Sequence, residues 1–397
     1  MKIKNLNKVL SRSFLAVSNV GRGLLIGFSG LLLNYILLQY NAIEVLNTYV
    51  YFISVFGLFY ILTNWGGKFF NIKEISKNPK HTKQLISSLI SSKIILVLFC
   101  GLIILFIPLE IKTKVLMMVF LFLKSLTPIF DALIIYRKKS KIVFIAELIF
   151  NTIFLSLIFS YSSTFKPFSF LIYLIILESL KSVFYLTLLW KEISFNLSIL
   201  KSQNILKKSF YFFGLSITGF LASKVDLYII GILINKETMS YYFIISSLTS
   251  VSMVIYASVI NTFETSIYRF NPSLFNKLEN LLQYFGILFS IIATLGFYLV
   301  TNYFYKIPID YKFSLLFFSN ILLFTLLNFE LYRYTKLEKQ KVILIILIIS
   351  VVINCVVSFL IIKKLLLIGA FLANTLGVLF NYIFLRLYYK KILCHEI

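Results

Sequence analysis

The dominant pattern along this chain is a series of long apolar runs separated by short polar connectors. A run of about 18 or more apolar residues is long enough to cross the hydrocarbon core of a bilayer as one helix. Helices are therefore predicted over residues 14–37, 43–65, 84–107, 115–136, 142–161, 168–190, 209–234, 239–262, 280–302, 312–332, 342–362 and 366–389. This pattern is typical of an all-α integral membrane protein with about twelve transmembrane helices.

The composition agrees with this interpretation. Of the 397 residues, 59% are hydrophobic and 17% are aromatic, and the mean hydropathy is +0.92. Such values exceed what the surface of a soluble globular protein allows. The connectors are too short to hold a soluble domain.

The placement of the charges predicts the topology. The formal net charge is +24, a value that could also indicate a nucleic-acid partner. The basic residues, however, are concentrated in alternate connectors, as expected for the cytoplasmic side of a membrane protein. We therefore expect a multi-pass membrane protein with both termini in the cytoplasm, and no nucleic-acid partner.

The chain also divides into two similar parts. The connector 191–208 separates two sets of six predicted helices, an N-terminal lobe over 1–200 and a C-terminal lobe over 201–397. Each set begins on the cytoplasmic side, which predicts parallel repeats related by an axis along the membrane normal.

The sequence holds no pattern typical of an enzyme or of a cofactor site. Cys100 and Cys355 lie in predicted helices, and the two histidines, His81 and His395, are far apart. There is no metal-binding spacing, catalytic triad or phosphate-binding loop. We expect neither a cofactor nor a metal.

Charged residues inside the predicted helices are the candidate functional groups, because an ionisable side chain in hydrocarbon is costly and usually faces a protein interior or a hydrated path. The bases are Arg22, Lys93, Lys124, Lys181 and Lys224, and the acids are Asp131, Glu147, Glu178 and Asp226. Because bases outnumber acids, we expect a hydrated cavity that attracts anions.

Some of these charges have alternative explanations. Glu178 and Lys181 are three residues apart and can form a local pair on one helix face. Asp131 and Glu147 can lie at the membrane interface, where water would solvate them. Lys224 and Asp226 are two residues apart and point to opposite sides of a helix, so Asp226 is not expected to neutralise Lys224.

Four segments resemble a known family. They are SNVGRGLLIGFSGLLLNYILLQY (18–40), FGLFYILTNWGGKFFNIKEISKNPK (56–80), FLASKVDLYIIGILI (220–234) and YRYTKLEKQKVILI (332–345). These segments resemble the O-antigen transporters, the polysaccharide-export flippases of the multidrug/oligosaccharidyl-lipid/polysaccharide exporter (MOP) superfamily. The resemblance in layout extends over essentially the whole chain.

The resemblance implies two six-helix bundles around a central cavity that opens to one side of the membrane at a time. It implies an undecaprenyl-pyrophosphate-linked oligosaccharide as the substrate, moved from the inner to the outer leaflet of the bacterial cytoplasmic (inner) membrane for O-antigen, capsule or related polysaccharide synthesis. A polysaccharide polymerase and a chain-length regulator would be partners, beside the membrane lipids. Arg22 and Lys224 match positions where the family holds the pyrophosphate, whereas Lys93, Lys124 and Lys181 are candidates by depth and charge alone.

Two other functions compete with this one. A multidrug or cation antiporter of the same superfamily would share the architecture but would need acids in its cavity. A membrane-embedded oligosaccharide polymerase would need a large outer loop with reactive residues, and the outer connectors here are short. Transport driven by the membrane potential needs no ATP, and coupling to protons would assign Asp226, Glu178 or Asp131 as the ion-carrying or ion-pairing acids.

Overall fold

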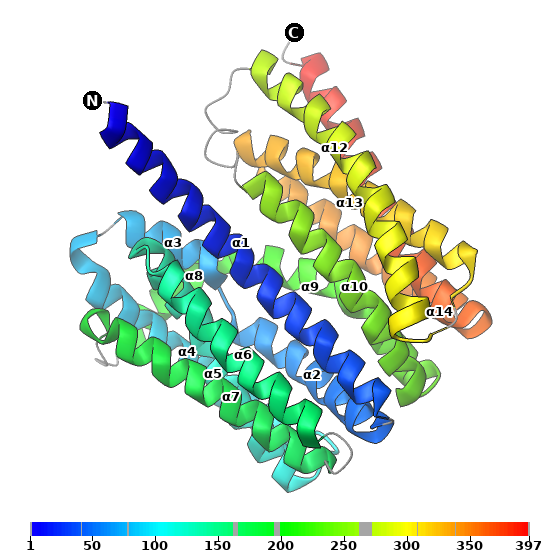
Figure 1. Cartoon of the computed structure of the whole chain (residues 1–397). Coiled ribbons are helices and arrows are strands. Elements are labelled where there is room, and N and C mark those ends of the chain that lie inside the picture. Colours follow the sequence, from blue (N-terminus) through cyan, green and yellow to red (C-terminus); the bar gives the residue numbers. More distant parts are fainter. Residues whose placement is uncertain are drawn as a thin grey trace. The chain divides into compact units, whose positions relative to one another are not determined.

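The structure is a computed structural model that describes residues 2–40, 42–77, 79–161, 166–193, 199–261, 272–307, 309–337 and 339–395 (Figure 1). All regular structure within these ranges is helical. The first part holds α1 (Lys2–Gln39), α2 (Ile43–Thr63), α3 (Gly67–Lys77), η1 (Pro79–His81), α4 (Thr82–Leu105), α5 (Ile111–Tyr136), α6 (Ser140–Tyr161), α7 (Pro167–Leu189), η2 (Trp190–Glu192) and α8 (Ile199–Lys208). The second holds α9 (Phe210–Leu233), α10 (Lys236–Asn261), α12 (Pro272–Leu299), the π-helical turn η3 (Val300–Phe304), α13 (Tyr311–Lys336) and α14 (Gln340–His395).

Most of these helices are long enough to span a membrane. Among the described residues, 11 helices have the length and apolar composition of a membrane span. The last of them, Lys341–Tyr389, has 49 residues and is broken at Leu366, where φ is 50° and ψ is −126°. Since about 20 residues suffice for one crossing, the parts 341–365 and 366–389 each provide one. Counting both parts, the described residues provide twelve segments of spanning length, as expected, and the protein is a multi-pass membrane protein.

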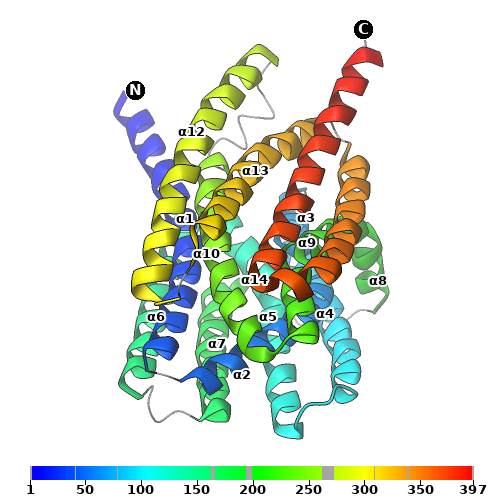
Figure 2. The same ribbon diagram turned by 90° about the vertical axis from the view of Figure 1, so that its right-hand side faces the viewer.

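The two parts of α14 lie antiparallel (Figure 2). The hydroxyl of Ser350 donates to the carbonyl of Gly377 over 3.0 Å. Nearer the break, a Cβ at Gly369 would lie 3.0 Å from the carbonyl oxygen of Ile361, so the absence of a side chain allows the two backbones to approach.

The chain forms two compact units. The first comprises Met1–Leu25 and Tyr40–Ile217, and the second comprises Ile26–Gln39 and Thr218–Ile397. Residues 201–217 thus group with the first unit and residues 26–39 with the second, whereas the sequence pattern predicts lobes over 1–200 and 201–397. A cavity between two lobes stays a prediction.

The first unit is built around α5, which packs against α2, α3, α4, α6 and α7. Its apolar core includes Ile129, Phe130 and Leu133 of α5, packed with side chains of α3, α4 and α7. On the outside, large apolar side chains such as Leu98 and Phe159 are exposed. An apolar surface of this extent is costly in water and suits contact with lipid.

The second unit is built around α13, which packs against α10, α12 and α14. The rings of Phe297 and Phe317 stack with centroids 4.0 Å apart. The hydroxyl of Tyr305 donates to the carbonyl of Leu31 over 2.8 Å, which ties the end of α1 to the connector after η3.

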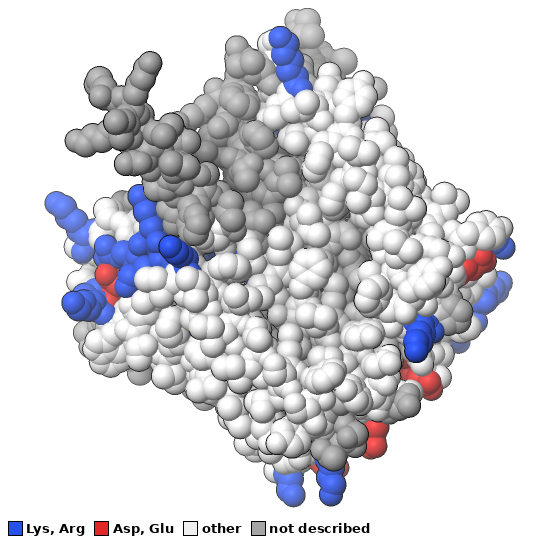
Figure 3. All heavy atoms as spheres, in the orientation of Figure 1, with Lys and Arg blue, Asp and Glu red and all other residues white. Residues whose placement is uncertain are grey.

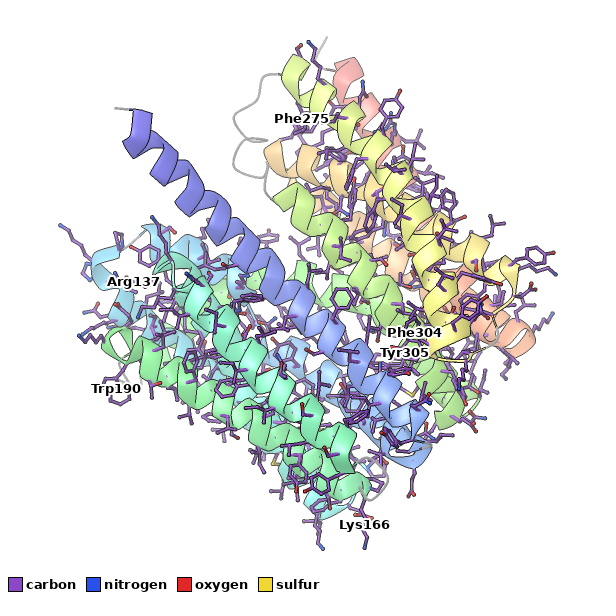
Figure 4. The ribbon with its side chains drawn as sticks, viewed as in Figure 1. Arg137, Lys166, Trp190, Phe275, Phe304 and Tyr305 are labelled. Atoms are coloured by element: carbon purple, nitrogen blue, oxygen red, sulfur yellow. The ribbon has the colours of Figure 1, made fainter. Side chains whose placement is uncertain are left out.

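Successive connectors alternate between the two ends of each unit. Figure 4 labels Arg137 and Trp190 at one end of the first unit and Lys166 at the other; in the second unit Phe275 lies at one end, and Phe304 and Tyr305 lie at the other. This is the alternation that the basic connectors predict. The cytoplasmic assignment of one end stays a prediction.

The junction between α2 and α3 is a sharp turn on two glycines. Gly66 and Gly67 have φ of 86° and 61°, values that favour glycine because it lacks a Cβ. Next to them, Trp65 stacks on Phe213 with centroids 3.8 Å apart, and its indole nitrogen donates to the carbonyl of Leu206 over 3.0 Å. The end of α2 is thereby fixed against α8 and the start of α9.

Candidate functional site

Arg22 lies between two carboxylates in the first unit. Its Nε donates to Glu147 Oε2 over 2.8 Å and its Nη2 to Glu147 Oε1 over 2.6 Å. The same Nη2 donates to Asp131 Oδ1 over 2.9 Å. Arg22 is 7% exposed and Glu147 is 3% exposed, so Glu147 is a buried ion-pair partner and is not solvated at the interface.

Glu147 has a further partner, since the hydroxyl of Tyr185 donates to it from α7. The Arg22 guanidinium makes two parallel hydrogen bonds to the Glu147 carboxylate, an arrangement for which arginine is suited. This cluster of Arg22, Asp131, Glu147 and Tyr185 has one base and two acids. It is therefore formally anionic, and Arg22 is not a free cation in this arrangement.

A second cluster lies near the middle of α5 and α7. Lys124 Nζ is 2.8 Å from Glu178 Oε2, and Lys181 Nζ is 3.5 Å from Glu178 Oε1. Lys181 also donates to Asn151 Oδ1 of α6 over 3.0 Å. The local pair of Glu178 and Lys181 is thus formed, with Lys124 added from another helix. Two bases share one acid, so the cluster is formally cationic.

The two clusters follow one another along the same three helices. Each helix contributes to both clusters at a spacing of four or seven residues, which keeps the side chains on one face. The contributing residues are Lys124 and Asp131 of α5, Asn151 and Glu147 of α6, and Glu178, Lys181 and Tyr185 of α7. Together with Arg22 of α1, they form a column in which three bases meet three acids.

The second cluster is the more accessible of the two. The Lys124 side chain is 30% exposed, against 9% for that of Arg22. Lys124 also lies 5.7 Å from the centroid of the Phe120 ring. Of the paired bases in the column, Lys124 is the one best placed to exchange its carboxylate partner for another anion.

Lys93 has different surroundings, because its partners are backbone carbonyls. Its Nζ donates to Thr63 O over 2.8 Å and to Trp65 O over 2.9 Å, at the C-terminus of α2. The last carbonyls of a helix lack partners within the helix and carry partial negative charge. Lys93, which is 1% exposed, therefore caps α2; a role in substrate binding stays a prediction.

In the second unit, Asp226 does not pair with Lys224. Asp226 is 1% exposed and accepts hydrogen bonds from the Tyr242 hydroxyl, from the Leu227 amide over 2.9 Å and from Asn374 Nδ2 over 3.4 Å. Lys224 is half-buried, and its Nζ lies 5.6 Å from the centroid of the Phe243 ring. Among the described residues, no carboxylate lies within 4.0 Å of Lys224, which agrees with the predicted opposite orientation.

Asparagines extend the surroundings of Asp226. Asn374 Oδ1 accepts from Asn320 Nδ2 over 2.9 Å. Asn354 and Asn374 both donate to the carbonyl of Ala222, each over 3.3 Å. Sequence reasoning did not single out these asparagines, although amides inside apolar spans are a usable signal because unpaired amides are costly in hydrocarbon.

A third charge cluster lies at the end of the second unit where α13 leaves its span. Arg333 is 2.5 Å from Glu279 and 2.7 Å from Glu330, and Arg386 is 3.3 Å from Glu330. Glu330 is 1% exposed. Glu330 and Arg333 are three residues apart on α13, whereas Glu279 comes from α12 and Arg386 from α14.

Comparison with known proteins identifies the fold. No family model matches the chain, and no curated protein matches it. Among solved structures, an inward-facing multidrug resistance MATE family transporter of the MOP superfamily aligns with a TM-score of 0.63 and 11% identity over 95% of each chain. A eukaryotic MATE transporter aligns with a TM-score of 0.63 and 16% identity over 96% of each chain.

A third solved structure, the lipid II flippase MurJ in an inward closed conformation, aligns with a TM-score of 0.61 and 16% identity over 96% of this chain and 87% of that one. The chain has the fold of the MOP-superfamily transporters. This MOP fold confirms the predicted all-α membrane class. It is common to multidrug transporters and a lipid flippase, so it does not distinguish the O-antigen group.

Proposed function

We propose that this chain is a flippase that moves an undecaprenyl-pyrophosphate-linked oligosaccharide from the inner to the outer leaflet of the bacterial cytoplasmic membrane by alternating access. The fold supports a transporter, and the presence of a lipid flippase among the similar structures supports a lipid-linked substrate. The observation that carries the proposal is the cluster in which Lys124 and Lys181 share Glu178.

The charge of this cluster favours an anion. A pyrophosphate carries roughly two negative charges and accepts charge-assisted hydrogen bonds from ammonium groups. Two lysines with a single carboxylate leave one formal positive charge unmatched. Glu178 holds both lysines when no substrate is present, which avoids the large cost of unpaired buried charges. A diphosphate would replace Glu178 as the partner of the accessible Lys124 and then of Lys181.

Lys224 is the second element of the proposal. It is a half-buried base without a carboxylate partner among the described residues, and a lysine of this kind inside a membrane span suits an anionic group. Outward movement of an anion gains about 2.3 kcal/mol per charge per 100 mV when the cell interior is negative. The membrane potential then drives export without a nucleotide.

The rest of the proposal concerns the cellular setting. Both termini lie in the cytoplasm, the two lobes alternate in access, and a polysaccharide polymerase and a chain-length regulator use the product. O-antigen or capsule synthesis is the proposed pathway. These elements follow from the basic connectors and from the family resemblance of the sequence.

The test is translocation in proteoliposomes. A fluorescent undecaprenyl-pyrophosphate-linked saccharide is reconstituted with the protein, and its appearance in the outer leaflet is followed by chemical quenching. We expect Lys124→Ala and Lys181→Ala to reduce the rate at least about tenfold, the loss of one charged hydrogen bond. Lys112→Ala, an exposed lysine near the start of the same helix α5, is the matched control and should leave the rate unchanged. Equal rates in all three variants would refute the role of the cluster.

One observation favours a second function, a cation or drug antiporter. The cluster around Arg22 contains two acids and one base, and an anionic site suits a cationic substrate. Efflux of ethidium from vesicles under an imposed ion gradient would support this alternative, provided that Asp131→Asn abolishes the efflux. Absence of ethidium efflux together with translocation of the lipid-linked saccharide would exclude it.

A further inference from the structure

The first unit has a pocket outside the charge column described above. Its volume is about 330 Å³, and it is bounded by α3, η1, α4 and α8. Its apolar lining comes from Phe70, Leu85 and Ile205, and its ionisable lining comes from Glu74, His81, Lys201 and Lys208. This volume is at the lower end of the range of small-molecule sites, so it suits a headgroup and not a whole lipid.

The pocket lies beside the ends of candidate membrane spans. α3 begins after the span of α2, α4 starts the next span, and α8 precedes the span of α9. All three elements therefore meet at the same end of the first unit. Figure 3 shows Lys and Arg side chains, with an acidic one among them, gathered at the end of the first unit where Figure 4 labels Arg137.

α8 holds the two lysines in place. Ser202 and Ile205 are buried, and the hydroxyl of Ser202 donates to the carbonyl of Ser88 in α4 over 3.3 Å. Lys201 and Lys208 are exposed and are seven residues apart, so they lie on one face, two helical turns apart. Apolar contact on one face and lysines on the other are typical of a helix that lies in the interface.

The charges of the pocket are not neutralised internally. Among the described residues, Glu74, His81, Lys201 and Lys208 form no ion pair within 4.0 Å. Two ammonium groups suit a phosphate, and a single carboxylate in the same pocket suits a cation. A ligand that carries a phosphate and an ammonium group satisfies both.

We infer that this pocket binds the headgroup of a zwitterionic aminophospholipid from the surrounding leaflet. Lys201 and Lys208 hold the phosphate, Glu74 accepts hydrogen bonds from the ammonium group, and Phe70, Leu85 and Ile205 contact the methylene groups between them. An anionic phospholipid has the phosphate but no ammonium group for Glu74, so it binds more weakly. The site is separate from the proposed substrate cluster and does not depend on the proposed function.

The experiment is native mass spectrometry of the full chain in detergent, titrated with phosphatidylethanolamine, phosphatidylglycerol or inorganic phosphate. We expect phosphatidylethanolamine to bind several-fold more tightly than phosphatidylglycerol. Lys201→Gln combined with Lys208→Gln should weaken binding about tenfold or more, because charged hydrogen bonds are lost. Lys207→Gln is the matched control, since Lys207 is exposed on the same helix but does not line the pocket.

Glu74→Gln should affect the binding of the two phospholipids differently. We expect it to remove the preference for phosphatidylethanolamine while phosphatidylglycerol binding is kept or strengthened. Equal binding of both lipids by the unmodified chain would overturn the inference, as would binding that the double lysine variant does not weaken. Inorganic phosphate that competes fully with the lipid would also overturn it, since the ligand would then be a free anion.

A second measurement uses only the unmodified chain, so its result does not depend on whether a variant folds. The unmodified chain is irradiated with a photoactivatable phosphatidylethanolamine, and the labelled peptides are mapped. Labels on peptides from α3 and α8 support the inference, and labels confined to other helices contradict it.

Discussion

Lys124 on α5 and Glu178 on α7 form an ion pair of 2.8 Å near the middle of their membrane spans. The same carboxylate lies 3.5 Å from Lys181. A single acid therefore holds two bases, and it competes with any anion that would bind them. This competition connects the resting structure with the proposed transport of a diphosphate.

Glu178→Gln should increase the affinity for the diphosphate headgroup and slow translocation. Without the carboxylate, Lys124 and Lys181 both lack an acidic partner. The diphosphate then binds them without first displacing Glu178. We expect an affinity about tenfold higher, equivalent to about 1.4 kcal/mol, measured by calorimetry with a soluble pyrophosphate-linked saccharide. Weaker binding in Glu178→Gln than in the unmodified chain would contradict the proposed competition.

Arg22→Lys should destabilise the first unit although it keeps the charge. Lysine cannot make the two parallel bonds that Arg22 makes to Glu147, so at least one buried acceptor loses its donor, at a cost of about 1–3 kcal/mol. Arg22→Ala, which leaves two carboxylates unpaired, should cost about 3–5 kcal/mol. Thermal unfolding in detergent measures both changes.

A double-mutant cycle gives the control for Arg22. Adding Glu147→Gln to Arg22→Ala removes one of the unpaired carboxylates, so the double variant should be more stable than Arg22→Ala alone. If the two substitutions lower the free energy of unfolding additively, the ion pair between Arg22 and Glu147 contributes little to stability.

Cysteines at positions 93 and 124 should differ in reactivity. Lys93 is 1% exposed, whereas the Lys124 side chain is 30% exposed. In a background where Cys355 and Cys394 are serine, a hydrophilic thiol reagent should modify Lys124→Cys and leave Lys93→Cys unmodified, as measured by the mass of the intact protein. Modification at position 93 alone would contradict the proposal that Lys124 is hydrated and that Lys93 is a buried cap of α2.

Asp226→Asn tests proton coupling, the alternative to transport driven by the membrane potential alone. Asp226 is a buried acid held by Tyr242 and Asn374, and an amide cannot carry a proton in its place. If Asp226 couples protons, the variant responds to an imposed membrane potential but not to an imposed pH gradient in proteoliposomes. Tyr242→Phe, which keeps the carboxylate, serves as the control and should retain the response to the pH gradient.

The sequence by itself determined the membrane class, the number of spans and the depth of the charged residues. Hydrophobic length is a local property, and the thickness of the bilayer sets the length that each helix needs. The opposite orientation of Lys224 and Asp226 was equally predictable, because both lie on one helix of known period. The same geometry offered the pair of Glu178 and Lys181 as one alternative, and the structure contains it.

Only the tertiary structure decided the partners of the charges. Arg22 pairs with Glu147 on α6 and with Asp131 on α5, and Lys93 caps α2 through carbonyls that carry no sequence signal. Such pairs depend on the rotation and the axial position of one helix relative to another. Hydrophobic periodicity does not encode either of them, because inside a membrane span nearly every face of a helix is apolar.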